Sequence, residues 1–192
     1  MKGRIGLFGG TFNPIHIGHL RLAEDVREEF AIEKVVFIPT HIPPHKKVEE
    51  EAGPRHRLAM VRLAISVNER FVCDDVELRR GGISYSIDTI DYVYDRYQFT
   101  GKPFFIIGSD LYRELDMWKD IETIKERVNF IILLREKWPL SAAESPPFFF
   151  STKRVLDITS SEVRKRIREG KSIRYLVTDD VLHYIEKENL YT

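Results

Sequence analysis

The sequence has one cysteine, no long apolar run and no net charge, and each of these absences excludes a class of protein. Cys73 has no partner for an internal disulfide, so a disulfide-stapled secreted domain is excluded and a reducing compartment is indicated. No apolar run approaches the length of a membrane span, and the short run after Lys2 and Arg4 predicts a first strand rather than a signal peptide. With 30 basic and 30 acidic residues, no global positive field attracts nucleic acid. We therefore expect a cytoplasmic protein with neither a membrane nor a nucleic-acid partner.

Two common nucleotide-binding motifs are also missing. The pattern GxGxxG cannot be placed on Gly6, Gly9 and Gly10, and no GK[ST] follows, so a dinucleotide fingerprint and a Walker loop are both excluded. Residues 6–20, GLFGGTFNPIHIGHL, instead combine a buried strand, a glycine turn and the start of a helix, which is typical of a phosphate site. Gly9 and Gly10 let backbone amides approach a ligand, and Thr11 can add a hydroxyl.

Two histidines close this first stretch. His16 and His19 are expected at the mouth of the following helix, where the helix dipole is positive. Gly18 between them leaves room for a flat base against the backbone. One alternative is a tight turn with two surface histidines. Another is a zinc site that adds His41 and His45, although no thiolate or carboxylate stands at ligand spacing.

The remaining chain alternates strand and helix patterns. This alternation predicts an α/β fold, a Rossmann-like doubly wound parallel sheet with helices on both faces and a small C-terminal helical portion, within one domain of residues 1–192. Strands are expected at 4–8, 35–38, 71–76, 103–107, 130–134 and 148–150, and helices at 18–30, 54–68, 86–97, 111–127 in pieces, 159–168 and 178–188. Ligands of such sheets bind beyond the carboxyl ends of the strands. The loops at Gly9, Pro39, Gly81 and Gly108 all follow predicted strands, so we expect them to share one rim.

The next two loops offer groups that bind anions. Residues 39–47, PTHIPPHKK, hold His45, Lys46 and Lys47 on a proline-stiffened loop, which is either a second phosphate clamp or a solvated surface loop. In the following stretch GGISYSIDT, Ser84 or Ser86 caps a helix in a purely structural interpretation. In a functional interpretation the free amides at that helix start receive a carboxylate or a phosphate.

The last two stretches complete the set. Asp110 comes just after a strand end, where a carboxylate can hold ribose hydroxyls, and Trp118 either stacks a heteroaromatic ring or packs in the core. Thr159 and Glu162 form a capping box at the start of a helix. Positive charges then follow in the first turns, where they oppose the helix dipole and suit either a polyphosphate or a solvated basic face: Arg164, Lys165 and Arg166.

In this order, the stretches resemble the bacterial nicotinate mononucleotide adenylyltransferase family of the HxGH nucleotidyltransferase superfamily. The resemblance runs from Gly6 to Tyr191 and is carried by GLFGGTFNPIHIGHL, PPHK, GGISYSIDT, GSDLYRELDMW, ITSSEVR and VTDDVLHYI. It implies that ATP and nicotinate mononucleotide react in line to give deamido-NAD and pyrophosphate, without a covalent enzyme intermediate. The chain departs from the family at residues 135–139, REKWP, where the family usually reads RPGY-like, and Ser161 replaces a threonine.

The resemblance also implies roles for individual residues. The implied catalytic residues are His16, His19, Lys46 and Arg164. The implied ATP-binding residues are Gly9, Gly10, Thr11, Gly18, Gly108, Asp110, Ser160 and Ser161. The implied residues for nicotinate mononucleotide are His45, Ser86, Trp118 and Lys119, with Trp118 stacking the pyridine ring and backbone amides near Ser86 and Lys119 receiving the carboxylate. Mg²⁺ is expected to be bound mainly through ATP phosphates and water, with no protein metal ligand.

Three rival interpretations stay open at this point. His16 to His19 spells the HIGH signature of class I aminoacyl-tRNA synthetases, but no KMSKS-like segment follows and 192 residues leave little room for tRNA-binding domains. A phosphopantetheine adenylyltransferase shares the superfamily, but SYSIDT and Trp118 argue against it. A nucleotide-sensing module would bind without reacting. The partners expected are ATP and nicotinate mononucleotide, and a homo-oligomer is left open.

Overall fold

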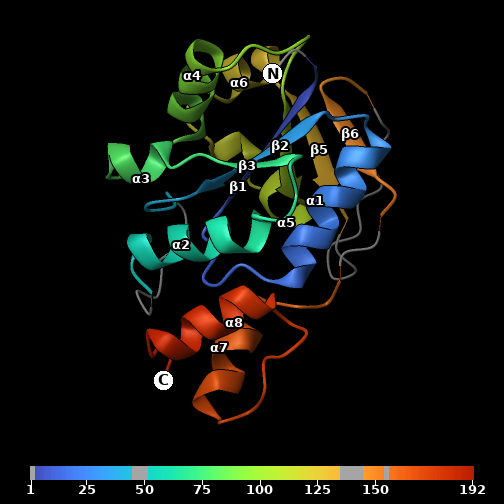
Figure 1. Ribbon diagram of the computed structural model, residues 1–192. Coiled ribbons are helices and arrows are strands. Elements are labelled where there is room, and N and C mark those ends of the chain that lie inside the picture. The colour runs from blue at the N-terminus through green and yellow to red at the C-terminus, as the bar shows by residue number, and fades with distance from the viewer. Residues whose placement is uncertain (1–2, 45–51, 135–144, 154–155) are drawn as a thin grey trace.

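A six-stranded, all-parallel sheet forms the centre of the protein, with the strand order β3-β2-β1-β4-β5-β6 (Figure 1). The structure is a computed structural model that describes residues 3–44, 52–134, 145–153 and 156–192. The strands are β1 (Ile5–Gly10), β2 (Lys34–Pro39), β3 (Phe71–Cys73), β4 (Phe104–Gly108), β5 (Asn129–Leu133) and β6 (Phe148–Ser151). The order runs outward from β1 in one direction and then from β4 in the other, as in a doubly wound sheet.

Helices cover both faces of the sheet. They are α1 (Ile17–Glu29), α2 (Pro54–Ile65), α3 (Val76–Arg80), α4 (Ser86–Arg96), α5 (Ser109–Tyr112), the 3₁₀ helix η1 (Leu115–Met117), α6 (Ile121–Arg127), α7 (Ser160–Arg168) and α8 (Asp179–Lys187). Val26 of α1 and Val61 of α2 pack in one core cluster with Phe8, whereas Ile90 of α4 packs in a second cluster with Leu7. Neighbouring strand residues point to opposite faces, so burial on both sides explains the unbroken apolar runs of the strands. The predicted fold class is confirmed.

The C-terminal helices α7 and α8 lie beyond the sheet, at the lower end of the molecule in Figure 1. Val163 of α7 and Val181 of α8 belong to the same core cluster as α1 and α2. A hydrogen bond of 3.0 Å joins His56 Nδ1 on α2 to the Tyr184 hydroxyl on α8. The small C-terminal portion is therefore attached to the face of the sheet that α1 and α2 cover.

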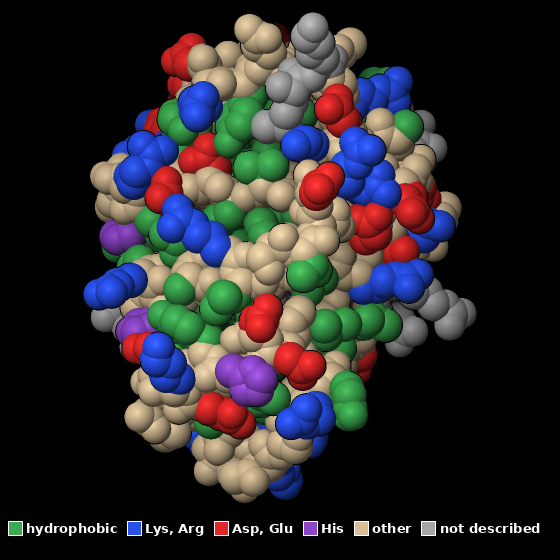
Figure 2. Space-filling view, viewed as in Figure 1, with side chains coloured by type: hydrophobic (Ala, Val, Ile, Leu, Met, Phe, Trp, Pro, Cys, Tyr) green, Lys and Arg blue, Asp and Glu red, His purple; other side chains and the backbone are tan. Residues whose placement is uncertain are grey.

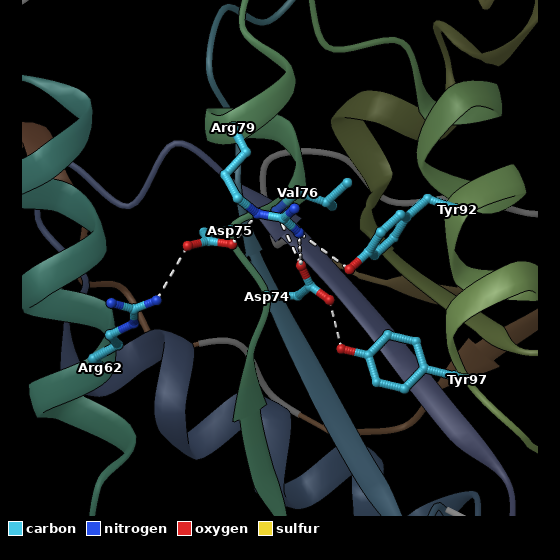
Figure 3. A network of polar contacts seen from close by, with 7 residues as sticks. All are labelled: Arg62, Asp74, Asp75, Val76, Arg79, Tyr92 and Tyr97. Carbon is cyan, nitrogen blue, oxygen red and sulfur yellow. Dashed lines mark hydrogen bonds and ion pairs between the residues drawn. The ribbon is translucent and has the colours of Figure 1, made fainter.

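The third strand is shorter than predicted. The prediction extended it from 71 to 76, but β3 ends at Cys73 and Val76 begins α3. The reason is local: Asp74 Oδ1 accepts a hydrogen bond of 3.0 Å from the backbone N–H of Val76, which turns the chain away from the sheet. The Tyr97 hydroxyl donates to Asp74 Oδ2 at 2.6 Å and holds that carboxylate in place (Figure 3).

The loop at Gly81 and Gly82 consequently follows a helix, and the prediction that it follows a strand is wrong. Both glycines have positive φ angles, of 70° and 67°, which residues with a side chain rarely adopt. The loop nevertheless returns to the rim. The Ser84 N–H donates to the Ile42 carbonyl at 2.8 Å, and the His41 N–H donates to Ser84 Oγ at 3.1 Å. The segment after β2 and the start of α4 therefore lie side by side.

The surface carries mixed charge. Figure 2 shows basic and acidic side chains interspersed over the face it presents, with hydrophobic side chains between them. This distribution agrees with the equal numbers of basic and acidic residues in the sequence. Of the helices that the structure describes, none has the length and apolar character of a membrane span.

Candidate active site

The strand order reverses between β1 and β4, and the candidate site lies at this switch point. β1 pairs with β2 along its whole length, up to Gly10 opposite Pro39. Its pairing with β4 consists of Gly6 with Phe104 and Leu7 with Phe105. The ladder between the two central strands is thus confined to their amino-terminal part. In sheets of this kind, ligands bind at the carboxyl end of the switch point.

The two histidines form one stacked unit at the start of α1. The His16 N–H donates to His19 Nδ1 at 3.2 Å, and the imidazoles stack with ring centroids 3.6 Å apart at 28°. His16 is 6% exposed, so the alternative of two surface histidines is wrong. Because Nδ1 of His19 accepts a hydrogen bond, the neutral ring carries its proton on Nε2. His19 can therefore donate to an anion. Its ring packs edge-to-face with that of Phe12, with the ring centroids 5.1 Å apart.

Gly18 is required by the packing of the first histidine. A Cβ atom at this position would lie 3.0 Å from Nδ1 and 3.1 Å from Cε1 of the His16 ring. Contacts this short are rare for real Cβ atoms, so a side chain at position 18 would displace the imidazole. The structure thus supplies a reason for this glycine beyond the predicted room for a base, which stays a prediction.

The two glycines that end β1 differ in their surroundings. A Cβ atom on Gly10 would lie 3.0 Å from the Phe12 ring, so this glycine admits the aromatic side chain. No atom of the described residues lies within 4 Å of a Cβ atom on Gly9. The space beside the Gly9 backbone is accordingly open, and the approach of a ligand to it stays a prediction; Thr11 follows on the partly exposed rim.

The amino-terminal end of α7 contacts the loop that carries the histidines. Arg164 is 8% exposed, and its Nη1 donates to the Asn13 carbonyl at 2.9 Å. Ser160 Oγ donates to the Pro14 carbonyl at 2.9 Å. Ser161 lies in the same turn, with its Oγ 3.5 Å from Arg164 Nη2. The structure therefore brings together the two segments that the sequence predicts to hold ATP phosphates, although they are about 150 residues apart.

The start of α4 has no side-chain cap. The residue before it is Tyr85, which makes no capping hydrogen bond, and Ser86 is the first helical residue. Ser84 instead accepts the hydrogen bond from the segment after β2, so the prediction that a serine caps this helix is wrong. Lys119 reaches this helix start: its Nζ lies 4.8 Å from the Tyr85 ring centroid and 3.9 Å from Asp88 Oδ1. Lys119 thus lies beside the first turn of α4, which begins at Ser86, and the predicted role of both residues stays a prediction.

Trp118 is anchored against the core of the sheet. Its half-buried ring makes edge-to-face contacts with Phe105 at 5.9 Å and Phe130 at 6.4 Å. These contacts support the packing interpretation, because they fix the plane of the indole. A fixed, half-exposed ring is also suited to stacking, so the two interpretations are compatible.

Other predicted residues lie on the same rim or outside the described residues. Gly108 ends β4, the neighbour of β1, and Asp110 lies in the first turn of α5. His45, Lys46 and the divergent segment 135–139 lie outside the described residues. The zinc alternative needs His45; within the described part of the chain no group of three or more His, Cys, Asp or Glu side chains is arranged to hold a metal.

Sequence reasoning missed Arg57 and Tyr191. Arg57 is 1% exposed and its Nη1 donates to the carbonyls of Thr11 and Thr40, both at 2.7 Å. A signal for it exists, because it shares its helix face with the buried residues Met60, Val61 and Ala64, where a charge is unusual. The Tyr191 hydroxyl donates to Asn13 Oδ1 at 2.7 Å, and no local pattern indicates this contact.

A hollow of about 570 Å³ lies elsewhere, between α7 and α8. Its lining includes Ile167, Lys171, Arg174, Leu182 and Asn189. None of the residues predicted to bind either nucleotide lines it. The candidate site is therefore defined by the converging loops of the rim and not by this hollow.

Comparisons with known proteins show which family the chain resembles over most of its length. Residues 7–166 match the cytidylyltransferase-like family model. Probable nicotinate-nucleotide adenylyltransferases of Citrifermentans bemidjiense and Desulfitobacterium hafniense are each 40% identical to this chain. Each match covers 98% of this chain, together with 98% of the first relative and 95% of the second.

Among solved structures, the nicotinic acid mononucleotide adenylyltransferase of Plasmodium falciparum complexed with NaAD has a TM-score of 0.75 at 22% identity. It covers 100% of this chain and 98% of its own, and its complex with APC gives a TM-score of 0.72. These neighbours share the fold. Given the identity to the curated relatives over nearly the whole length, the chain belongs to the nicotinate-nucleotide adenylyltransferase family.

Proposed function

We propose that this protein transfers the adenylyl group of ATP to nicotinate mononucleotide. The phosphate of nicotinate mononucleotide attacks the α-phosphorus of ATP in line, the P–O bond to the β-phosphate breaks, and deamido-NAD and pyrophosphate form. The observation that carries the proposal is the stacked histidine pair beside the open backbone of Gly9, at the switch point, in a chain 40% identical to relatives of this family. The protein acts mainly by positioning two nucleotides and stabilising charge.

The histidine end of the rim binds the ATP phosphates. His19 donates from Nε2, His16 stacks behind it, and the backbone at Gly9 and Gly10 lets a phosphate approach closely. The first amides of α1 face the same place, where the helix dipole favours an anion. Arg164 adds a positive charge from α7 while its Nη1 holds the loop at Asn13. Removing one donor of this kind typically lowers kcat by about 10²–10³-fold.

The pyridine end of the rim is formed by α4 and the segment at Trp118. The uncapped amides of α4 near Ser86 supply donors for the nicotinate carboxylate, and the Lys119 ammonium beside Tyr85 supplies positive charge. Trp118 stacks the pyridine ring. A site built to bind a carboxylate discriminates against the amide analogue, because buried donors are then left without a partner. We therefore infer a preference for nicotinate over nicotinamide mononucleotide.

Mg²⁺ completes the proposed reaction as a partner of ATP. Around the histidine pair the described residues supply backbone groups, imidazoles and hydroxyls rather than a cluster of carboxylates. That donor set fits an ion bound through phosphates and water. When bound, Mg²⁺ neutralises phosphate charge, and the protein's residues orient the nucleotides. We also infer a cytoplasmic location, which the free thiol of Cys73 supports.

Pyrophosphate release tests the proposal. The protein is incubated with ATP and Mg²⁺, together with nicotinate mononucleotide in one series and nicotinamide mononucleotide in another. We expect pyrophosphate release when ATP and a mononucleotide are both present. The kcat/KM for nicotinate mononucleotide should be higher than that for nicotinamide mononucleotide. ATP binding without release in either series would identify a sensing module instead and would overturn the proposal.

A further inference from the structure

One buried arginine joins the two loops that end β1 and β2. Arg57 lies in α2, and its Nη1 donates to the carbonyls of Thr11 and Thr40, both at 2.7 Å. Its Nη2 lies 3.4 Å from the His41 carbonyl. The Thr40 N–H also donates directly to the Gly10 carbonyl, at 2.9 Å. Just beyond the last strand pair, Gly10 with Pro39, the guanidinium therefore holds the backbone carbonyls of both loops together.

The positive charge is expensive to bury at this position. Arg57 is 1% exposed, and desolvation lowers its pKa, while electrostatic interactions with Tyr191 and Glu77 act in the opposite direction. An apolar residue would pack against the face of α2 formed by Met60 and Val61 without this desolvation cost. A buried charge here is consistent with a task that packing alone cannot perform, namely holding several backbone carbonyls in fixed positions.

The two loops lead to opposite ends of the candidate site. Thr11 lies between the glycines of β1 and the histidine pair, at the end proposed for the ATP phosphates. From Thr40 the chain runs through His41, whose N–H donates to Ser84 Oγ, and so reaches the residues just before α4. That helix start is the end proposed for the nicotinate carboxylate. Arg57 is thus the mechanical link between the two ends of the site.

We propose that Arg57 is a positioning residue that sets the separation of the two bound nucleotides for in-line transfer. This inference rests on the proposed function. Its side chain lies beneath the loops and donates to their carbonyls, so it acts through Thr11 and Thr40 rather than on a substrate. Misplacing a reacting group by about 1 Å costs up to about 10²-fold in rate. Loss of Arg57 therefore lowers kcat more than it weakens the binding of either nucleotide alone.

The test compares Arg57→Met and Arg57→Lys with Arg55→Met, a control that removes an exposed arginine from the same helix. We expect Arg57→Met to lower kcat by about 100-fold, with the KM for each substrate changed by less than about fivefold. Lysine keeps the charge and can donate to carbonyls, so the kcat of Arg57→Lys should be about tenfold higher than that of Arg57→Met. Circular dichroism measures the folded fraction of every variant, and kcat is calculated from the concentration of folded protein.

Amide hydrogen exchange of the ligand-free proteins supplies a readout that does not depend on activity. Exchange should rise in residues 8–13 and 37–44 together in Arg57→Met, less in Arg57→Lys, and in neither segment in Arg55→Met. Two results would overturn the inference: unchanged exchange in Arg57→Met, or a kcat for folded Arg57→Met within threefold of that of Arg55→Met. Neither result affects the proposed function as long as the parent protein is active. A parent without turnover overturns the proposed function itself and the catalytic part of this inference with it. If Arg57→Met does not fold, Arg57→Lys decides between these outcomes.

Discussion

Replacing Gly18 with alanine tests the geometry of the histidine pair without removing a polar group. The new Cβ atom would lie 3.0 Å from Nδ1 of His16, whereas ordinary van der Waals contacts begin near 3.4 Å. The imidazole must therefore move by a few tenths of an ångström. Because the ring stacks on His19 at 3.6 Å, we expect the displacement to reach the ring that donates to the phosphate.

The effects of Gly18→Ala on stability and on activity should separate. Alanine is favoured over glycine in a helix by about 1 kcal/mol, and moving the ring off its preferred rotamer costs about 0.5–1.5 kcal/mol. These contributions nearly cancel, so the free energy of unfolding should stay within about 1 kcal/mol of the parent's. Displacement of a catalytic group lowers kcat/KM by about 10–100-fold, equivalent to about 1.4–2.7 kcal/mol of transition-state stabilisation.

The assay combines pyrophosphate release with urea denaturation of the same preparations. A double-mutant cycle with His16→Ala isolates the contact, because alanine at position 18 should cause no further loss once the ring is absent. A kcat/KM for Gly18→Ala within twofold of the parent's would refute the reasoning. So would losses that simply add in the double variant.

Four further predictions concern His19, Trp118 and the buried thiol of Cys73. His19→Ala should lower kcat by about 10²–10³-fold with the fold intact, and an unchanged rate in steady-state kinetics would remove it from the site. Trp118→Ala should raise the KM for nicotinate mononucleotide more than the KM for ATP; equal increases would leave the ring a packing role only. Burial raises the pKa of the Cys73 thiol to about 11, so alkylation of the native protein at pH 8 should be slow and should accelerate up to pH 10. Because this folded-state pKa is raised, the contribution of Cys73 to stability is present below about pH 8.5 and is lost as the pH rises towards 11, which denaturation at several pH values measures.

The parts of the fold that depend on local patterns could be predicted. Unbroken apolar runs located the strands of the sheet because both faces are covered, although β1 continues through Gly9 and Gly10, which were predicted to form a turn. Pro54 begins α2, and Thr159 caps α7 by accepting the Glu162 N–H at 3.1 Å, as expected. The strand β3 was predicted too long because Val76 is apolar and fits a buried strand. In the structure the Asp74 side chain accepts the Val76 N–H, and a helix begins there instead.

The parts of the site that depend on contacts between distant segments could not be predicted from spacing. His16 and His19 could be recognised as a pair, but the stacking of their rings and the tautomer of His19 depend on how the loop folds. Arg57 binds Thr11, 46 residues away, through a backbone carbonyl that every residue possesses. Because the partners of Arg57 are backbone carbonyls, the residue types at those positions can vary, and no sequence motif marks the contact. Burial on an apolar helix face was the sole signal for it.

A crystal structure with deamido-NAD bound tests the central claim most directly. We predict that the diphosphate of the product lies over Gly9 within hydrogen-bond distance of His19 Nε2. The pyridine carboxylate should lie at the first turn of α4, beside Lys119. A product molecule in the hollow between α7 and α8, or with its diphosphate remote from both imidazoles, would contradict the account.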